Sequence, residues 1–233
     1  MFADEPTGYS GRRFDCGWSE RPETAADIAM RVQALARRLG AVDPAFALVR
    51  PDPGMRKFRP GDLGPIVDIT RAELADRIER RGRFDPPRFP APVSSQGYSL
   101  LYRNDRLDSS HVSVSVKAGV CEYGANRNEA WVWPDAQHSI WRDPERGVEV
   151  LDALVEAWDA EWAIAFAYGI TPPVEVLEGP TPVRPWLAWT AKPLRPRPNP
   201  PYRRPYPSFF PLDHAGPPAE VRAWRGGELS IWP

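Results

Sequence analysis

The chain has 233 residues, with 30 basic and 31 acidic side chains, a formal net charge of −1 and 42% hydrophobic residues. These values suit a packed globular protein and exclude a disordered one, and the near-zero charge argues against a general nucleic-acid binder, whose surface is basic. No run approaches the ~18 apolar residues of a transmembrane helix, residues 1–10 lack the features of a secretory signal, and two cysteines cannot build a disulfide framework or a zinc cage, so we expect a cytoplasmic protein.

Two helices are predicted in the first third of the chain. The first covers about residues 24–39, with Gly40 as the expected stop and one apolar stripe formed by Ile28, Val32, Leu35 and Leu39. The second covers about residues 71–81. Thr70 and Glu73 have the spacing of a capping box at its start, and a glycine follows its end.

Strand-like segments fill the middle and the end of the chain. Residues 111–116 alternate strictly between polar and apolar side chains, which is typical of a half-buried antiparallel strand. The chain closes with a predicted hairpin around Gly226–Gly227, formed by residues 220–225 and 228–232. Further strands are predicted at residues 98–103, 130–133, 162–168 and 186–191. Strands clustered in this way, without regular β–α–β units, predict an α+β fold: a mainly antiparallel sheet with about three helices packed on it.

A third helix is predicted from Asp143 as its cap and Pro144 as its first residue to about Trp158. Its acidic residues are spaced four, three, four and three apart, and fall within about an 80° arc opposite the apolar side chains: Glu145, Glu149, Asp152, Glu156 and Asp159. Two interpretations stay open. The acidic side is either a solvated outer face or a surface that docks on a basic partner and speeds association.

Prolines and arginines are concentrated near the C-terminus. The chain has 29 prolines, against ~12 expected from average usage. Residues 193–218 hold the densest group, together with four arginines. We interpret this segment as an extended, polyproline-like insertion within a single domain of residues 1–233, because the hairpin that follows is too small to fold alone.

Searches for catalytic and metal-binding motifs find none. The chain has no G-x-S-x-G elbow, Walker loop, G-x-G-x-x-G or H-E-x-x-H motif, and the lysine of a P-D…(D/E)-x-K nuclease core is missing. Asp135 and His138 are close in sequence, and such a pair can act as a base, but no nucleophile accompanies them. Cys16 and Cys121 are interpreted as buried reduced thiols. We therefore expect no catalytic residues, no metal site and no cofactor.

The chain has 10 tryptophans, and those on predicted strands are interpreted as core residues: Trp131, Trp133, Trp186 and Trp189. Trp141 lies in a predicted loop between His138 and Pro144. It is therefore the tryptophan that we expect to be exposed for contact with a partner.

Four segments resemble parts of one known family. Residues 14–39 (F-D-C-G-W-S-E-R-P-E-T and the helix that follows) resemble the opening of the immunity protein 52 family. Residues 150–165 (V-L-D-A-L-V-E-A-W-D-A-E-W-A-I-A) resemble its L-V-x-A-W-x-P-D-W segment, with Ala160 where a proline is common. Residues 185–190 (P-W-L-A-W-T) resemble its later G-W-L-T-Y strand, and the closing hairpin occupies the place of its last strands.

The family belongs to bacterial polymorphic-toxin systems, whose immunity proteins are thought to bind a cognate toxin inside the producing cell. The toxin is often a nuclease of the restriction-endonuclease-like class. The resemblance therefore implies a stoichiometric toxin inhibitor, in a 1:1 complex or, as a homodimer, in a 2:2 complex, with no nucleic-acid or membrane partner. The acidic helix face and Trp141 are the candidate contact residues. Two alternatives are a small hydrolase that uses Asp135 and His138, and a non-catalytic scaffold that offers the proline-rich register of residues 195–201.

Overall fold

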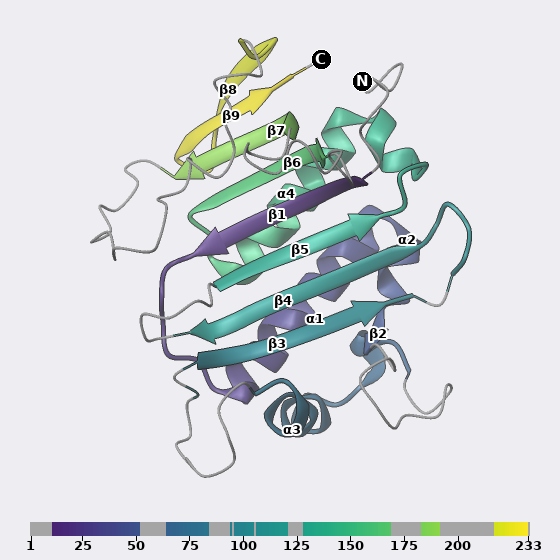
Figure 1. Ribbon diagram of the computed structural model, residues 1–233, viewed down its shortest axis with the longest axis vertical. Coiled ribbons are helices and arrows are strands. Elements are labelled where there is room, and N and C mark those ends of the chain that lie inside the picture. Colours follow the sequence, from purple (N-terminus) through teal and green to yellow (C-terminus); the bar gives the residue numbers. More distant parts are fainter. Residues whose placement is uncertain are drawn as a thin grey trace, which may run out of the picture.

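The computed structural model describes residues 11–51, 64–83, 94, 96–104, 106–120, 128–168, 183–191 and 217–232. These residues form one antiparallel sheet of nine strands in the order β2-β3-β4-β5-β1-β6-β7-β9-β8 (Figure 1). The strands are β1 (Gly11–Trp18), β2 (Arg50–Pro51), β3 (Gln96–Arg103), β4 (Val112–Val120), β5 (Asn128–Pro134), β6 (Trp162–Tyr168), β7 (Val183–Ala191), β8 (Glu220–Trp224) and β9 (Gly227–Ile231). The predicted α+β class is confirmed.

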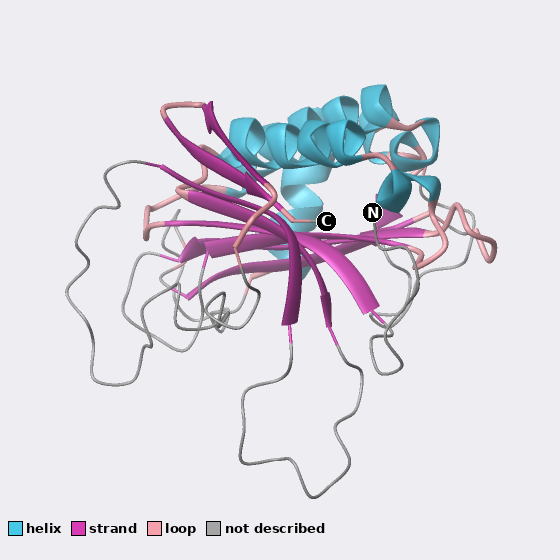
Figure 2. Cartoon of the chain, turned by 90° about the horizontal axis from the view of Figure 1, so that it is seen from above, coloured by secondary structure: helices cyan, strands magenta, loops and turns pink. Residues whose placement is uncertain are grey.

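The two long helices, α1 and α4, lie together on one face of this sheet (Figure 2). The helices are α1 (Ala25–Val42), α2 (Pro44–Ala47), α3 (Arg71–Arg81) and α4 (Pro144–Trp158), with single 3₁₀ turns η1 (Ile66–Asp68) and η2 (Ser139–Arg142). We call the opposite side of the sheet the open face, because none of the described helices packs on its central strands. Within the described ranges, no helix has both the length and the apolar character needed to span a bilayer.

All three predicted helices are present, and the N-cap residues of α3 and α4 are the predicted ones. α3 and α4 have the predicted bounds, with Thr70 and Asp143 as their N-caps. The hydroxyl of Thr70 accepts a hydrogen bond from the backbone N–H of Glu73 at 3.3 Å. α1 begins after Thr24, whose hydroxyl accepts from the N–H of Asp27 at 3.2 Å, while the Asp27 carboxylate accepts from the N–H of Thr24 at 2.9 Å. This reciprocal pair is a capping box.

The prediction that Gly40 ends the first helix is wrong. α1 continues through Gly40 to Val42 and ends at Asp43, which is also the N-cap of α2. The requirement for glycine here is steric, because a Cβ atom at position 40 would lie 2.8 Å from the Cβ of Ala47. Gly40 therefore allows α2 to pack closely against the end of α1.

The central strand, β1, has no counterpart among the predicted strands. It lies between β5 and β6, and its side chains alternate between the two faces of the sheet. Phe14, Cys16 and Trp18 are buried toward the helices, whereas Arg13 and Asp15 lie on the open face. The short strand β2 also has no predicted counterpart. The remaining strands overlap the predicted ones, except that the hairpin turn falls one residue early, at Arg225–Gly226. Both turn residues have left-handed φ values, 47° and 71°, as a type I′ hairpin turn requires.

The core lies between the sheet and the two long helices. It contains two aromatic stacks, and the two rings within each stack are nearly parallel. Trp18 stacks on Trp158 with ring centroids 4.6 Å apart, and Phe14 stacks on Trp141 at 4.7 Å. Trp186 is buried against the second stack, 5.7 Å from Trp141. The assignment of Trp186 and Trp189 to the core is confirmed. For Trp131 and Trp133 it is wrong, because both are half-buried on the open face.

Two further predictions concern residues that are only partly described. Cys16 is buried and forms no disulfide, as predicted. Cys121 and residues 193–216 of the proline-rich insertion lie outside the described ranges.

Replacing Trp158 with alanine tests how much the first stack contributes. The substitution removes a fully buried indole and leaves a cavity, so we expect the free energy of unfolding to fall by ~3–5 kcal/mol in urea denaturation followed by circular dichroism. Leu107→Ala, at a fully exposed position, is the control and should change stability by less than ~0.5 kcal/mol. Similar losses for the two variants would contradict the assignment.

Candidate functional site

The acidic residues predicted on the third helix lie along the outer face of α4. Four are exposed and one, Asp152, is half-buried. The apolar side chains on the opposite side of the helix are buried: Val150, Leu151, Leu154 and Trp158. Asp159 is the C-cap of α4 and adopts a left-handed conformation with φ 48°. The predicted amphipathic arrangement is therefore confirmed, and we call the outer side the acidic face (Glu145, Glu149, Asp152, Glu156 and Asp159).

Arginines of the β8–β9 hairpin form hydrogen-bonded ion pairs with the acidic face. Arg222 of β8 donates to both carboxylate oxygens of Glu145, at 3.1 and 3.2 Å. Arg225, in the hairpin turn, donates to Asp152 at 2.5 Å and to Glu156 at 2.6 Å. These hydrogen bonds raise the pKa of both guanidinium groups above the ordinary arginine value. Part of the negative charge of α4 therefore holds the hairpin against the helix.

The remaining carboxylates of the acidic face differ in how far they are neutralised. Glu156 has a second partner, Arg38 of α1, at 3.0 Å, and Asp159 lies 4.0 Å from Arg21. Glu149 forms no ion pair within the described part of the chain. Exposed ion pairs stabilise a protein by only ~0–1 kcal/mol each, so a partner's cation can compete for these carboxylates. The acidic face is thus a partly neutralised surface whose least compensated charge is Glu149.

The prediction that Trp141 is exposed for partner contact is wrong. Trp141 belongs to η2, not to an open loop, and only 1% of its surface is exposed. Its ring stacks on Phe14, and its indole N–H donates to the carbonyl oxygen of Asp135 at 2.9 Å. Because both the apolar ring and the polar N–H are satisfied inside the protein, Trp141 is a core residue.

Asp135 and His138, the pair behind the hydrolase alternative, are placed in local capping contacts. The Asp135 carboxylate accepts a hydrogen bond from the backbone N–H of Gln137 at 2.8 Å. His138 is the N-cap of η2: its Nδ1 accepts from the N–H of Ile140 at 3.2 Å, and its Nε2 lies 3.9 Å from Asp43. Burial lowers the pKa of His138, although Asp43 opposes this effect. Both side chains therefore stabilise the turn between β5 and η2 by accepting hydrogen bonds from its backbone N–H groups.

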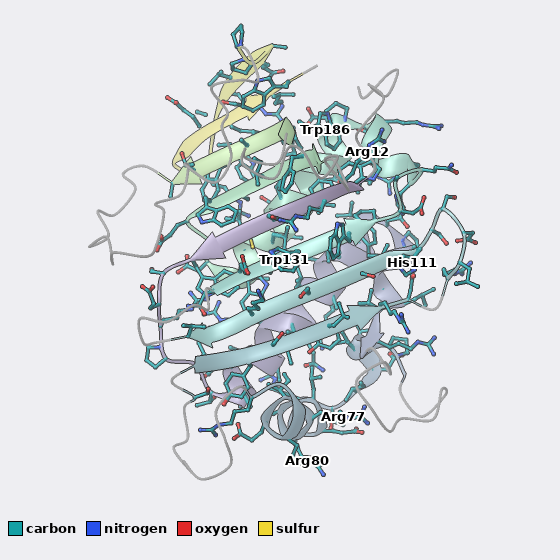
Figure 3. All side chains as sticks on the ribbon, viewed as in Figure 1. Arg12, Arg77, Arg80, His111, Trp131 and Trp186 are labelled. Atoms are coloured by element: carbon teal, nitrogen blue, oxygen red, sulfur yellow. The ribbon has the colours of Figure 1, made fainter. Side chains whose placement is uncertain are left out.

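His111 has different side-chain contacts from those of His138. The Nδ1 of His111 lies 2.9 Å from the carbonyl oxygen of Arg106, at the start of β4 (Figure 3). Among the described residues, no three His, Cys, Asp or Glu side chains are grouped so that they could hold a metal ion.

The open face carries a cluster that the sequence interpretation misses. Figure 3 shows this face toward the reader, with Trp131 of β5 near its middle. The Arg13 guanidinium lies 5.0 Å from the ring of Trp131, 5.7 Å from Trp133 and 5.0 Å from Phe166. It also forms an ion pair with Asp15 at 2.8 Å. Stacking against aromatic faces is a typical environment for arginine at binding surfaces.

Asp15, the ion-pair partner of Arg13, is a buried carboxyl group whose pKa is raised. Its exposed fraction is 2%, and one of its oxygens, Oδ1, has no hydrogen-bond partner among the described residues. Burial raises the pKa of Asp15 to about 7, although the charge of Arg13 opposes the rise. The signal in the sequence is the period-two alternation of Phe14, Cys16 and Trp18 around Arg13 and Asp15, which predicts a strand with a polar face.

Beside this pair, Lys117 of β4 lies 4.9 Å from the ring of Trp131 and forms an ion pair with Glu129 at 3.0 Å. The central part of the open face therefore holds two cations, Arg13 and Lys117, each against a tryptophan ring and each paired with a carboxylate. Tryptophan and arginine are enriched at protein interfaces, whereas lysine and carboxylates are depleted there.

No protein-family model and no curated protein matches this chain. The geometry of the two surfaces and the segment resemblance are therefore the grounds for a functional proposal.

The raised pKa of Asp15 makes stability depend on pH. Between about pH 4 and pH 7 the folded protein holds a proton on Asp15, whereas the unfolded chain, with the ordinary pKa of 3.8, has released it. In this window the folded state binds more protons than the unfolded state. The free energy of unfolding therefore falls by up to ~1.4 kcal/mol per pH unit as the pH rises, and it levels off above the window. Urea denaturation across the window should show this component in the wild type and not in Asp15→Asn. Parallel profiles for the two proteins would contradict it.

Proposed function

We propose that this protein is an immunity protein that neutralises a bacterial toxin by binding it stoichiometrically. The observation that carries the proposal is the spatial arrangement of the four resembling segments. Residues 14–39 contribute to β1 and α1, residues 150–165 to α4 and β6, residues 185–190 to β7, and the closing hairpin is β8–β9. Their strands are consecutive neighbours in the sheet, β1-β6-β7-β9-β8, and α1 packs on α4. Segments far apart in the sequence thus build one continuous half of the fold, as expected when the resemblance reflects a shared architecture.

The charge distribution of α4 also supports a binding function. A nuclease that holds nucleic-acid phosphates needs a basic surface, and a helix face lined with carboxylates is complementary to such a surface. The ion pairs to Arg222 and Arg225 keep three of these carboxylates in defined positions before any partner arrives. A preorganised surface loses less conformational entropy on binding than a flexible one. We favour binding over the hydrolase alternative because Asp135 and His138 act as caps.

Co-expression tests the proposal directly. Produced together with the toxin encoded by a neighbouring gene, the protein should restore growth of the host cell. In isothermal titration calorimetry it should form a complex with a 1:1 protomer ratio and a dissociation constant at or below about 1 μM, which corresponds to ~8 kcal/mol of binding free energy. Absence of binding at micromolar concentrations would defeat the proposal.

Charge reversal at Glu149 tests the role of the acidic face. Glu149→Lys removes a carboxylate that has no ion pair among the described residues and adds a positive charge, so we expect the association rate with the toxin to fall by roughly three- to tenfold at low salt. The measurement is stopped-flow association at several salt concentrations. Asp68→Lys makes the same charge change at an exposed residue of η1 and serves as the matched control. Equal rates for the two variants would remove α4 from the interface.

A further inference from the structure

A groove lies where the outer side of α4, the end of α1 and the β8–β9 hairpin meet. Its volume is about 460 Å³. Part of its lining is apolar: Val42 from α1, Val148 and Ala153 from α4, and Trp224 from the end of β8. The volume is within the ~300–1,000 Å³ range of sites that accept a ligand or an anchoring side chain.

The acidic part of the lining consists of three carboxylates in different electrostatic states. Glu145 is neutralised by Arg222, and Asp152 by Arg225. Glu149, which also lines the groove, has no ion pair in the described ranges. One further cation, Arg38, lines the groove, but it is itself paired with Glu156 at 3.0 Å. The groove therefore presents one uncompensated negative charge beside apolar surface.

Trp224, the aromatic residue of the lining, is held in place by the buried Trp189. The ring of Trp224 meets that of Trp189 edge to face, with centroids 5.4 Å apart and planes at 88°. The indole N–H of Trp189 donates to the carbonyl oxygen of Trp224 at 2.9 Å. A buried core residue thus fixes Trp224, so the groove exists before a partner binds.

We propose that this groove binds a basic side chain of a partner protein, together with an adjacent apolar side chain. The cation would pair with Glu149, while the apolar side chain and the aliphatic part of the basic one would contact Val148 and Trp224. Arginine and lysine are the side chains that combine a long apolar stem with a charged end, and arginine is enriched at the energetic centres of interfaces. If the protein is an immunity protein, this side chain belongs to the toxin, and in this respect the inference rests on the proposed function.

Synthetic peptides test the groove without the toxin. The probes are Ac-Gly-Arg-Leu-Arg-Gly-NH₂ and its acidic counterpart, Ac-Gly-Glu-Leu-Glu-Gly-NH₂, each titrated into the ¹⁵N-labelled full chain at low salt. We expect the basic peptide to shift the resonances of Val148, Glu149 and Trp224 saturably, and the acidic peptide to leave them unchanged. Binding of both peptides, or shifts confined to other parts of the chain, would overturn the proposal.

Two variants separate charge from shape. Glu149→Lys reverses the unpaired charge, and Ala41→Phe places a ring in the groove from an exposed position that lines it. Each should weaken binding of the basic peptide by about fivefold or more, whereas the Asp68→Lys control should not. Unchanged affinity in both Glu149→Lys and Ala41→Phe would overturn the proposal. Because no toxin is present, a failure here leaves the toxin-binding proposal intact. Conversely, a toxin that fails to bind while the peptide binds would defeat that proposal alone.

Discussion

The stack of Trp18 on Trp158 joins the central strand to the last turn of α4, and the contacts that place this helix are arranged around it. Arg21 and Arg31 donate to backbone carbonyl oxygens in that turn, at 2.7 and 3.0 Å, and both form ion pairs with the buried Glu23. A helix C-terminus leaves its last carbonyl groups unpaired and carries partial negative charge. Since the last turn of α4 contains no basic residue, arginines from outside the helix supply the compensating charge.

Fixing α4 from its inner side has a consequence for its outer side. The helix presents its carboxylates in one row, and the β8–β9 hairpin reaches them through Arg222 and Arg225. The ion pairs of Arg222 and Arg225 therefore connect the acidic face of α4 to the β8–β9 hairpin at the edge of the sheet, and the groove lies between them. The open face carries a different chemistry, in which Arg13 and Lys117 lie against tryptophan rings and each is paired with a carboxylate.

Local sequence signals predict much of the secondary structure, but they do not predict the tertiary contacts. The caps at Thr70 and Asp143 define the starts of α3 and α4, because a cap is a contact within four residues. By contrast, the pair between Arg222 and Glu145 joins residues 77 positions apart, so no periodicity reveals that the hairpin neutralises α4. Trp141 shows the same limit, because its burial depends on Phe14 in a distant strand. The alternation of Phe14, Cys16 and Trp18 with Arg13 and Asp15 is a sequence signal for β1. Its central place in the sheet has no such signal, because its partner strands, β5 and β6, are distant in the sequence.

We propose that the outer side of α4 and the β8–β9 hairpin form the surface that contacts a toxin. Hydrogen–deuterium exchange of the protein, alone and in complex with the toxin of a neighbouring gene, tests this surface most directly. We expect slower exchange on binding in the hairpin, residues 220–231, and along α4, with little change in α3. Protection confined to α3 or to β4 and β5, with unchanged exchange in the hairpin, would contradict it.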